Sequence, residues 1–133
     1  MKNARVLLIE DDKLLRKACE VGLQKRGFAV LTAADGEEGI QQARAGSPDL
    51  ILLDMLMPKL SGMQTLSALK KDEQTCRIPV VILSNSSIES DKQKAKELGA
   101  IGYLVKASLS LQELADRVAS YIEGVNETKN PPT

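Results

Sequence analysis

Residues 50–54 read LILLD, four consecutive apolar residues followed by one acid, Asp54. A short apolar run without polar alternation is typical of a strand that is covered on both faces of a sheet. Comparable runs cover residues 6–9, 28–32, 80–83 and 101–105. The sequence therefore predicts five parallel strands, of which the one that ends at Asp54 is the most apolar.

Amphipathic helical patterns separate these strands. The predicted helices cover residues 13–26, 37–45, 62–71, 87–98 and 110–122. Asp35 is a plausible N-cap of the second helix, and Ser110 with Glu113 forms the capping-box signature of the last one. Because strict alternation of strand and helix implies right-handed crossovers, the predicted fold is a doubly wound α/β sandwich with helices on both faces of a parallel sheet.

Composition limits the function classes that the chain can belong to. Its 133 residues fit one domain, and its 18 Lys and Arg balance its 18 Asp and Glu, so net charge gives no reason to expect nucleic acid or a membrane as a direct partner. Histidine is absent, which removes the commonest zinc ligand and the usual general base. The apolar run near the N-terminus is too short for a signal peptide, so a cytoplasmic location is expected. Cys19 and Cys76 show no metal or redox spacing and are expected to be buried or half-buried thiols.

Polar residues stand directly after four of the predicted strands. They are Glu10, Asp11, Asp12, Asp54, Ser84 and Lys106. Functional groups in doubly wound sheets gather at the carboxyl ends of the strands, so these side chains are expected to lie close together. Neighbouring carboxylates repel one another, and Mg²⁺ is a hard cation that prefers oxygen ligands. A magnesium site at this edge of the sheet is therefore predicted.

The same residues suggest phosphoryl chemistry. Asp carboxylates can act as nucleophiles that form an aspartyl-phosphate, and Asp54 is assigned this role because it stands alone after its strand. Glu10 and Asp11 are adjacent and are better suited to the metal. Ser84 and Lys106 would supply a hydroxyl and an ammonium to the phosphoryl oxygens. Asp12 is expected to cap the following helix instead of joining the site.

Four segments resemble the two-component response-regulator receiver domain. They are VLLIEDD (6–12), DLILLDMLMPKLSG (49–62, with Pro58 and Gly62), PVVILS (79–84) and GYLVK (102–106), and the resemblance covers residues 4–123. It implies a (βα)5 fold with strands in the flavodoxin-like order 2-1-3-4-5. It also implies a signalling phosphoacceptor, not an enzyme, with a receiver domain over residues 1–125. Residues 126–133 are expected to form a polar tail or linker.

The resemblance assigns roles to individual residues. It implies that Asp54 takes phosphate from a histidine kinase, a phosphotransfer protein or a small phosphodonor. Mg²⁺ would be bound by Asp11, Asp54 and the main-chain carbonyl of Leu56, with Glu10 acting through a metal-bound water. An apolar Leu56 also predicts slow autodephosphorylation, because its side chain cannot orient an attacking water.

A conformational switch is implied by the same resemblance. Ser84 and Lys106 would contact the phosphoryl oxygens, after which the Ser84 hydroxyl moves inward and Tyr103 follows. The surface that then changes would lie within residues 87–122 and would meet a downstream protein or a second copy of the chain.

Two departures from the family pattern leave an alternative function open. Ala107 follows Lys106 where the family has proline, and a cis bond before a non-proline residue costs about 2.5–4 kcal/mol, which leaves either a trans bond or a strained one. Asn85 replaces a small residue beside the site. The alternative is a receiver-like scaffold that binds partners without phosphorylation.

Two further classes fit the sequence less well. A small hydrolase or phosphatase with an aspartyl nucleophile would carry a second Asp two positions later, where Leu56 stands. A flavodoxin-type cofactor module would need a phosphate-binding loop rich in Ser, Thr and Gly after the first strand, and the acids at residues 10–12 would repel a flavin phosphate.

Overall fold

Five parallel strands form the centre of the molecule in the computed structural model, which describes residues 4–57 and 59–129. The strands are β1 (Arg5–Ile9), β2 (Ala29–Ala33), β3 (Leu50–Asp54), β4 (Val80–Ser84) and β5 (Gly102–Val105). Their order across the sheet is β2-β1-β3-β4-β5, and every neighbouring pair is parallel. The predicted fold class and strand order are confirmed, and each strand end lies within one residue of its predicted position.

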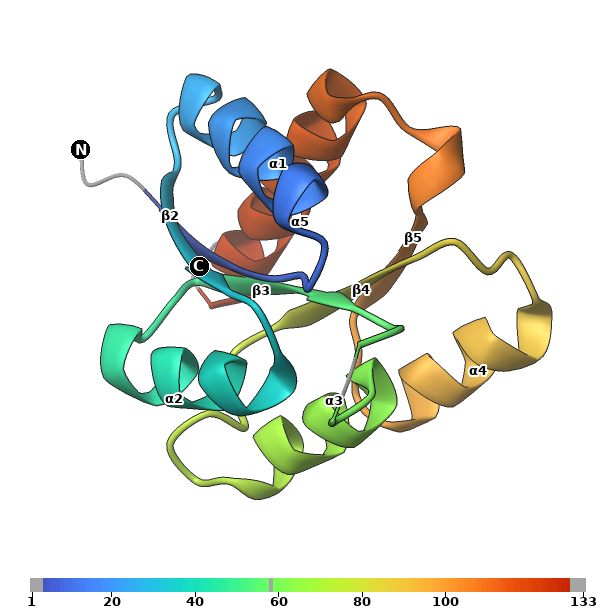
Figure 1. Ribbon diagram of the computed structural model, residues 1–133. Coiled ribbons are helices and arrows are strands. Elements are labelled where there is room, and N and C mark those ends of the chain that lie inside the picture. The colour runs from blue at the N-terminus through green and yellow to red at the C-terminus, as the bar shows by residue number, and fades with distance from the viewer. Residues whose placement is uncertain (1–3, 58, 130–133) are drawn as a thin grey trace.

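Helices cover both faces of the sheet (Figure 1). They are α1 (Lys13–Lys25), α2 (Gly36–Gly46), α3 (Gly62–Lys71), α4 (Glu89–Glu97) and α5 (Leu111–Lys129). Helices α1 and α5 lie together on one face, and α2, α3 and α4 lie on the other. The chain steps from β1 outward to β2 and then returns past β1 to β3, so the strand order reverses between β1 and β3. A doubly wound sheet carries its site at the carboxyl ends of the strands next to this reversal.

Alternate strand residues divide the core into two layers. Leu8 and Leu52 belong to the cluster under α1 and α5, whereas Ile9 and Leu53 belong to the cluster under α2, α3 and α4. All four side chains are fully buried. Because both faces of the sheet are covered, its central strands need apolar residues at every position, which explains the continuous runs in the sequence.

Helix caps explain where several elements begin. Asp12 accepts hydrogen bonds from the backbone amides of Leu14 and Leu15, so its predicted capping role is confirmed. Asp35 caps α2. The capping box of Ser110 and Glu113 also forms as predicted, with each side chain accepting a hydrogen bond from the other residue's amide. A second capping box, Ser61 with Gln64 at the start of α3, was not predicted.

The structure differs from the sequence prediction by more than one residue in three places. A 3-10 turn, η1 (Lys106–Ser108), follows β5 and was not predicted. Helix α4 begins at Glu89 instead of residue 87. Helix α5 continues to Lys129, so residues 126–129 of the predicted tail are helical. Pro58 and residues 130–133 lie outside the described residues. No helix in the described part of the chain combines the length and apolar character that a membrane crossing requires.

Both cysteines are free thiols, as predicted. Cys19 is buried in α1, where burial and then the negative charge of Glu10 raise the pKa of its thiol to about 11, against the opposing effect of Lys106. Cys76 is half-buried in the connection between α3 and β4.

Gly62 holds the loop after β3 against the end of that strand. Its amide donates a hydrogen bond of 2.8 Å to the carbonyl of Met55. A Cβ atom at this position would overlap the Asp54 carbonyl oxygen and would lie 2.6 Å from the Met55 Cα. Any side chain at residue 62 would therefore displace the backbone that carries Asp54.

We expect Gly62→Ala to lower the free energy of unfolding by about 2 kcal/mol or more, because its Cβ would overlap backbone atoms. Gly124→Ala in α5 is the matched control, since an added Cβ there would meet no other part of the described chain within 4 Å beyond its own helix backbone and its two chain neighbours. That change should be neutral or stabilising by up to about 1 kcal/mol, as expected for Ala replacing Gly within a helix. Urea denaturation of both variants tests the expectation, and equal stabilities would contradict it.

Candidate functional site

Most of the predicted site residues converge on one cavity at the carboxyl edge of the sheet. The cavity has a volume of about 390 Å³ and is lined by Glu10, Asp11, Asp12, Leu15, Asp54, Leu56, Asn85, Lys106 and Ala107. Strands β1, β3 and β5 bring Glu10, Asp54 and Lys106 to it, each at or directly after its strand. Ser84 and Tyr103 do not belong to this lining, whereas Asp12, which was expected to cap α1 instead of joining the site, does belong to it.

Lys106 pairs with two buried carboxylates at once. Its Nζ lies 2.8 Å from Glu10 Oε1 and 2.8 Å from Asp54 Oδ1. Glu10 is 1% exposed and Asp54 is 4% exposed. Burial would lower the pKa of Lys106, but its hydrogen bonds to Asp54 and Glu10 outweigh burial and raise that pKa above its usual value. The ammonium is therefore fixed as a permanent positive charge between the two acids.

One positive charge does not offset two buried negative charges. Burial raises the pKa of Asp54 from 3.8 to about 7; the hydrogen bond from Lys106 opposes this rise, and the charge of Glu10 adds to it. Removing water from a carboxylate favours its neutral form, and a neighbouring carboxylate has the same effect. The cavity is thus one cation short of balance when Asp54 is ionised.

Three acids are placed so that they could hold a metal ion. Carboxylate oxygens of Glu10, Asp11 and Asp54 all lie within 4.8 Å of one another. The donors are all oxygen atoms, which suits a hard divalent cation, and they meet where positive charge is lacking. Leu56 lines the same cavity and is 75% exposed.

Arg16 supports the acidic loop and was not predicted from the sequence. Its Nη1 donates hydrogen bonds to the main-chain carbonyls of Glu10, at 2.7 Å, and Asp11, at 3.4 Å. Asp12 closes the loop from the other side, because its amide donates to Glu10 Oε2 at 3.2 Å. The signal that could have found Arg16 is its place one turn into α1, which directs a long donor back toward the preceding loop.

Ser84 and Tyr103 share two neighbours in the structure. Ser84 is buried, and its Oγ accepts a hydrogen bond from the Ser86 amide at 3.0 Å and donates to Met55 Sδ at 3.7 Å. The Tyr103 hydroxyl donates to the Ser86 carbonyl at 2.9 Å and contacts Met55 Sδ at 4.0 Å. Sequence reasoning identified the two hydroxyl residues but not Met55, because no motif marks it.

The bond between Lys106 and Ala107 is trans, as are all peptide bonds among the described residues. The strained alternative that the sequence left open is therefore not adopted. Lys106 begins the η1 turn, and the amide of Leu109 donates to its carbonyl at 3.3 Å. The missing proline does not prevent the ammonium from reaching both acids. Asn85 and Ala107 both line the cavity, so each stands where a bound group would meet it.

A family model described as the response regulator receiver domain matches residues 6–119. The chain belongs to this family. The match spans the acids after β1, Asp54 and Lys106, so the receiver domain contains the whole cavity described above. Members of the family are signalling phosphoacceptors of two-component systems.

Relatives and solved structures agree with this membership. Protein PilH of Pseudomonas aeruginosa is 39% identical over 103 residues, which is 77% of this chain and 85% of PilH. The chemotaxis protein CheY4 of Vibrio cholerae is 30% identical, with a TM-score of 0.84 over 90% of this chain and 98% of that one. The receiver domain of the Francisella response regulator 1452 is also 30% identical, with a TM-score of 0.84 over 92% and 99% of the two chains.

Some relatives are about twice as long as this receiver domain. The probable transcriptional regulator ycf27 of Porphyridium aerugineum is 34% identical over 130 residues, which is 98% of this chain but 52% of the relative. The regulatory protein PhoP of Bacillus subtilis, which its name links to alkaline phosphatase synthesis, is matched over 49% of its length. The chain thus spans about half the length of these proteins.

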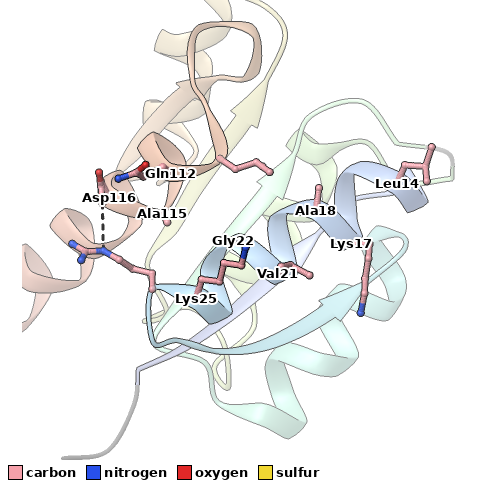
Figure 2. A pocket seen from close by; sticks show the side chains of 11 residues that line it. Leu14, Lys17, Ala18, Val21, Gly22, Lys25, Gln112, Ala115 and Asp116 are labelled. Atoms are coloured by element: carbon pink, nitrogen blue, oxygen red, sulfur yellow. Dashed lines mark ion pairs between the residues drawn. The ribbon is translucent and has the colours of Figure 1, made fainter.

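The receiver domain also carries an apolar groove between α1 and α5 (Figure 2). The groove has a volume of about 780 Å³, and Ala18, Val21 and Gly22 of α1 line it opposite Leu111 and Ala115 of α5. Lys17, Lys25 and Arg26 belong to its lining, and Arg26 pairs with Asp116 at 3.4 Å. This groove shares no lining residue with the acidic cavity. Its chemistry suits contact with an apolar surface instead of phosphoryl transfer.

We expect Asp54→Asn to become more stable than the wild type, in the metal-free protein, as the pH rises. Between pH 3.8 and about 7 the Asp54 carboxyl is ionised in the unfolded chain but protonated in the folded one. The unfolded state then binds fewer protons, so each pH unit in this window lowers the stability of the wild type relative to Asp54→Asn by up to about 1.4 kcal/mol. Above pH 7 the difference should stay constant.

Urea denaturation in EDTA from pH 4 to pH 8 measures this effect. Glu123→Gln, which removes an exposed acid on α5, is the control and should follow the wild type throughout. If the free energies of unfolding of Asp54→Asn and the wild type changed in parallel with pH, the prediction would be wrong, because burial would then not disfavour the ionised form of Asp54.

Proposed function

We propose that this receiver domain accepts a phosphoryl group on Asp54 and uses it to change a partner-binding surface. The observation that carries the proposal is the position of Asp54, which is buried at the cavity, 2.8 Å from the Lys106 ammonium and within the three-acid cluster. A nucleophilic carboxylate needs nearby positive charge to approach an anionic phosphoryl group, and this arrangement provides it.

The transfer step is a displacement at phosphorus. An Asp54 oxygen forms a bond to phosphorus while the bond from phosphorus to the donor's nitrogen or oxygen breaks, and the electron pair of that bond leaves with the donor. Lys106 stays beside Asp54 and offsets the negative charge of the phosphoryl oxygens. When bound, Mg²⁺ would be held by Asp11, Asp54 and the Leu56 carbonyl, with Glu10 acting through water, and would supply positive charge to the phosphoryl oxygens. In this way the protein assists its own phosphorylation and dephosphorylation.

The same proposal gives Ser84 and Tyr103 a switching role. Ser84 Oγ lies in a buried position with one weak acceptor, the Met55 sulfur. A phosphoryl oxygen on Asp54 is a stronger acceptor than a thioether, so it would draw the Ser84 hydroxyl toward itself. Tyr103, which shares the Met55 and Ser86 contacts, would then lose or change its neighbours.

Partners on both sides of the reaction are part of this role. A histidine kinase or phosphotransfer protein in the cytoplasm would supply the phosphoryl group, and a downstream protein or a second copy would bind within residues 87–122. Ile88 and Ile101 are large apolar side chains exposed in this region. The α1–α5 groove lies partly in the same range and begins at Leu14, close in sequence to the cavity residues Asp12 and Leu15.

We expect incubation with acetyl phosphate and Mg²⁺ to add one phosphoryl group to the wild type. Asp54→Asn should gain no mass, because its amide is not a nucleophile for this reaction. Asp35→Asn is the matched control, since Asp35 caps α2 and does not line the acidic cavity, so phosphorylation should stay intact. Intact-mass measurement with peptide mapping reads out all three proteins.

An unmodified wild type would contradict the proposal and favour a scaffold that works without phosphorylation. Mass added equally to Asp54→Asn would instead assign the phosphoryl group to another residue. Partner capture with and without the phosphodonor would then distinguish a switched surface from a constant one.

We expect Leu56→Asn to shorten the lifetime of the phosphorylated state severalfold. Leu56 lines the cavity and offers no polar atom in its side chain, whereas an amide could orient the attacking water. Leu14→Asn, which changes a similarly exposed leucine that does not line the acidic cavity, is the control. Loss of the phosphoryl mass over time gives the rates, and an unchanged rate in Leu56→Asn would remove this role.

A further inference from the structure

Ser86 joins the phosphoryl site to helix α4 through four hydrogen bonds. Its amide donates to Ser84 Oγ at 3.0 Å, and its carbonyl accepts from the Tyr103 hydroxyl at 2.9 Å. Its own Oγ donates to Asp91 Oδ2 at 2.7 Å and accepts from the Ile88 amide at 3.2 Å. The main chain of Ser86 thus holds both proposed switch residues, and its side chain holds the start of α4.

The start of helix α4 depends on the Ser86 side chain, because the N-cap residue of α4 has no hydrogen-bond acceptor in its own side chain. Its N-cap is Ile88, whose side chain cannot accept a hydrogen bond from the first turn. Ser86 Oγ binds the Ile88 amide instead, and Asp91 in the first turn accepts the Ser86 hydroxyl proton. Of the nine residues of α4, all of them described, Ala95 alone is buried. Little packing therefore opposes a change at the start of this helix.

We propose that the Ser86–Asp91 hydrogen bond transmits the state of Ser84 to helix α4. This inference rests on the proposed function, since it concerns the response of the fold once Asp54 is phosphorylated. When the Ser84 hydroxyl turns toward a phosphoryl oxygen, its lone pairs move away from the Ser86 amide. Ser86 then shifts, and its hydroxyl carries the shift to Asp91 and the first turn of α4.

Both Ser86 and Asp91 are coupling residues in this proposal, because neither lines the acidic cavity. Their removal should separate two events that occur together in the wild type. The phosphoryl site would still be filled, but α4 would no longer respond. A merely structural role would instead weaken both events.

The experiment uses beryllofluoride with Mg²⁺ as a stable mimic of the phosphoryl group on the full chain. Ser86→Ala keeps the amide and carbonyl that hold Ser84 and Tyr103 and removes only the hydroxyl. Asp91→Ala removes the acceptor on α4. Glu89→Ala, which changes the neighbouring acid in the same first turn, is the matched control. Amide hydrogen exchange over residues 86–97 and the beryllofluoride affinity are measured for each protein.

We expect the wild type and Glu89→Ala to change their amide exchange over α4 when beryllofluoride binds. Ser86→Ala and Asp91→Ala should bind beryllofluoride at least as tightly as the wild type, because binding no longer has to rearrange α4. Their α4 response should fall below about half of the wild-type change.

Two results would overturn the inference while leaving the proposed function intact. One is a full α4 response in both variants, and the other is a parallel loss of affinity and response, which would mark these residues as structural supports of the site. Failure of the wild type to bind beryllofluoride would overturn the proposed function and this inference together.

Discussion

The ammonium of Lys106, held between the buried carboxylates of Glu10 and Asp54, is the interaction on which the rest of the site depends. Lys106 and Glu10 are 96 residues apart in sequence, so this contact exists only if the outer strand β5 and the inner strand β1 end at the same edge of the sheet. The parallel order β2-β1-β3-β4-β5 satisfies that requirement. One cation between two acids leaves negative charge uncompensated, and a bound divalent ion would neutralise it.

The surroundings of Asp54 differ in how tightly they are packed. Strands β1 and β3 are buried along almost their whole length and fix the positions of Glu10 and Asp54. Behind them, Ser84, Met55, Tyr103 and Ser86 are joined by long sulfur contacts and single hydrogen bonds, which are easier to exchange than packed side chains. The site therefore combines precise placement of the reacting carboxylate with neighbouring hydrogen bonds that can rearrange.

Most of the fold was predictable because each local signal had one physical cause. Continuous apolar runs marked strands covered on both faces, and Asp12, Asp35 and Ser110 marked helix starts through their hydrogen-bonding side chains. The acids and Lys106 were predictable because a polar residue directly after a buried strand must lie at its carboxyl edge. Arg16 and Met55 were not, since their contacts depend on loop paths and side-chain rotamers that residue spacing does not determine. The same holds for the η1 turn, which replaced the loop geometry that a proline after Lys106 would have favoured.

The unequal burial of the two cysteines has a practical consequence for anyone who studies this molecule. Cys19 is sealed in the core with a thiol pKa of about 11, so very little thiolate forms there at neutral pH. Cys76 is the more accessible of the two and lies in the connection that enters β4, at the edge of the sheet opposite the acidic cavity. Under native conditions a maleimide dye would be directed to this one position. The natural chain thus offers a single attachment point for a fluorescent reporter, remote from the chemistry that it would monitor.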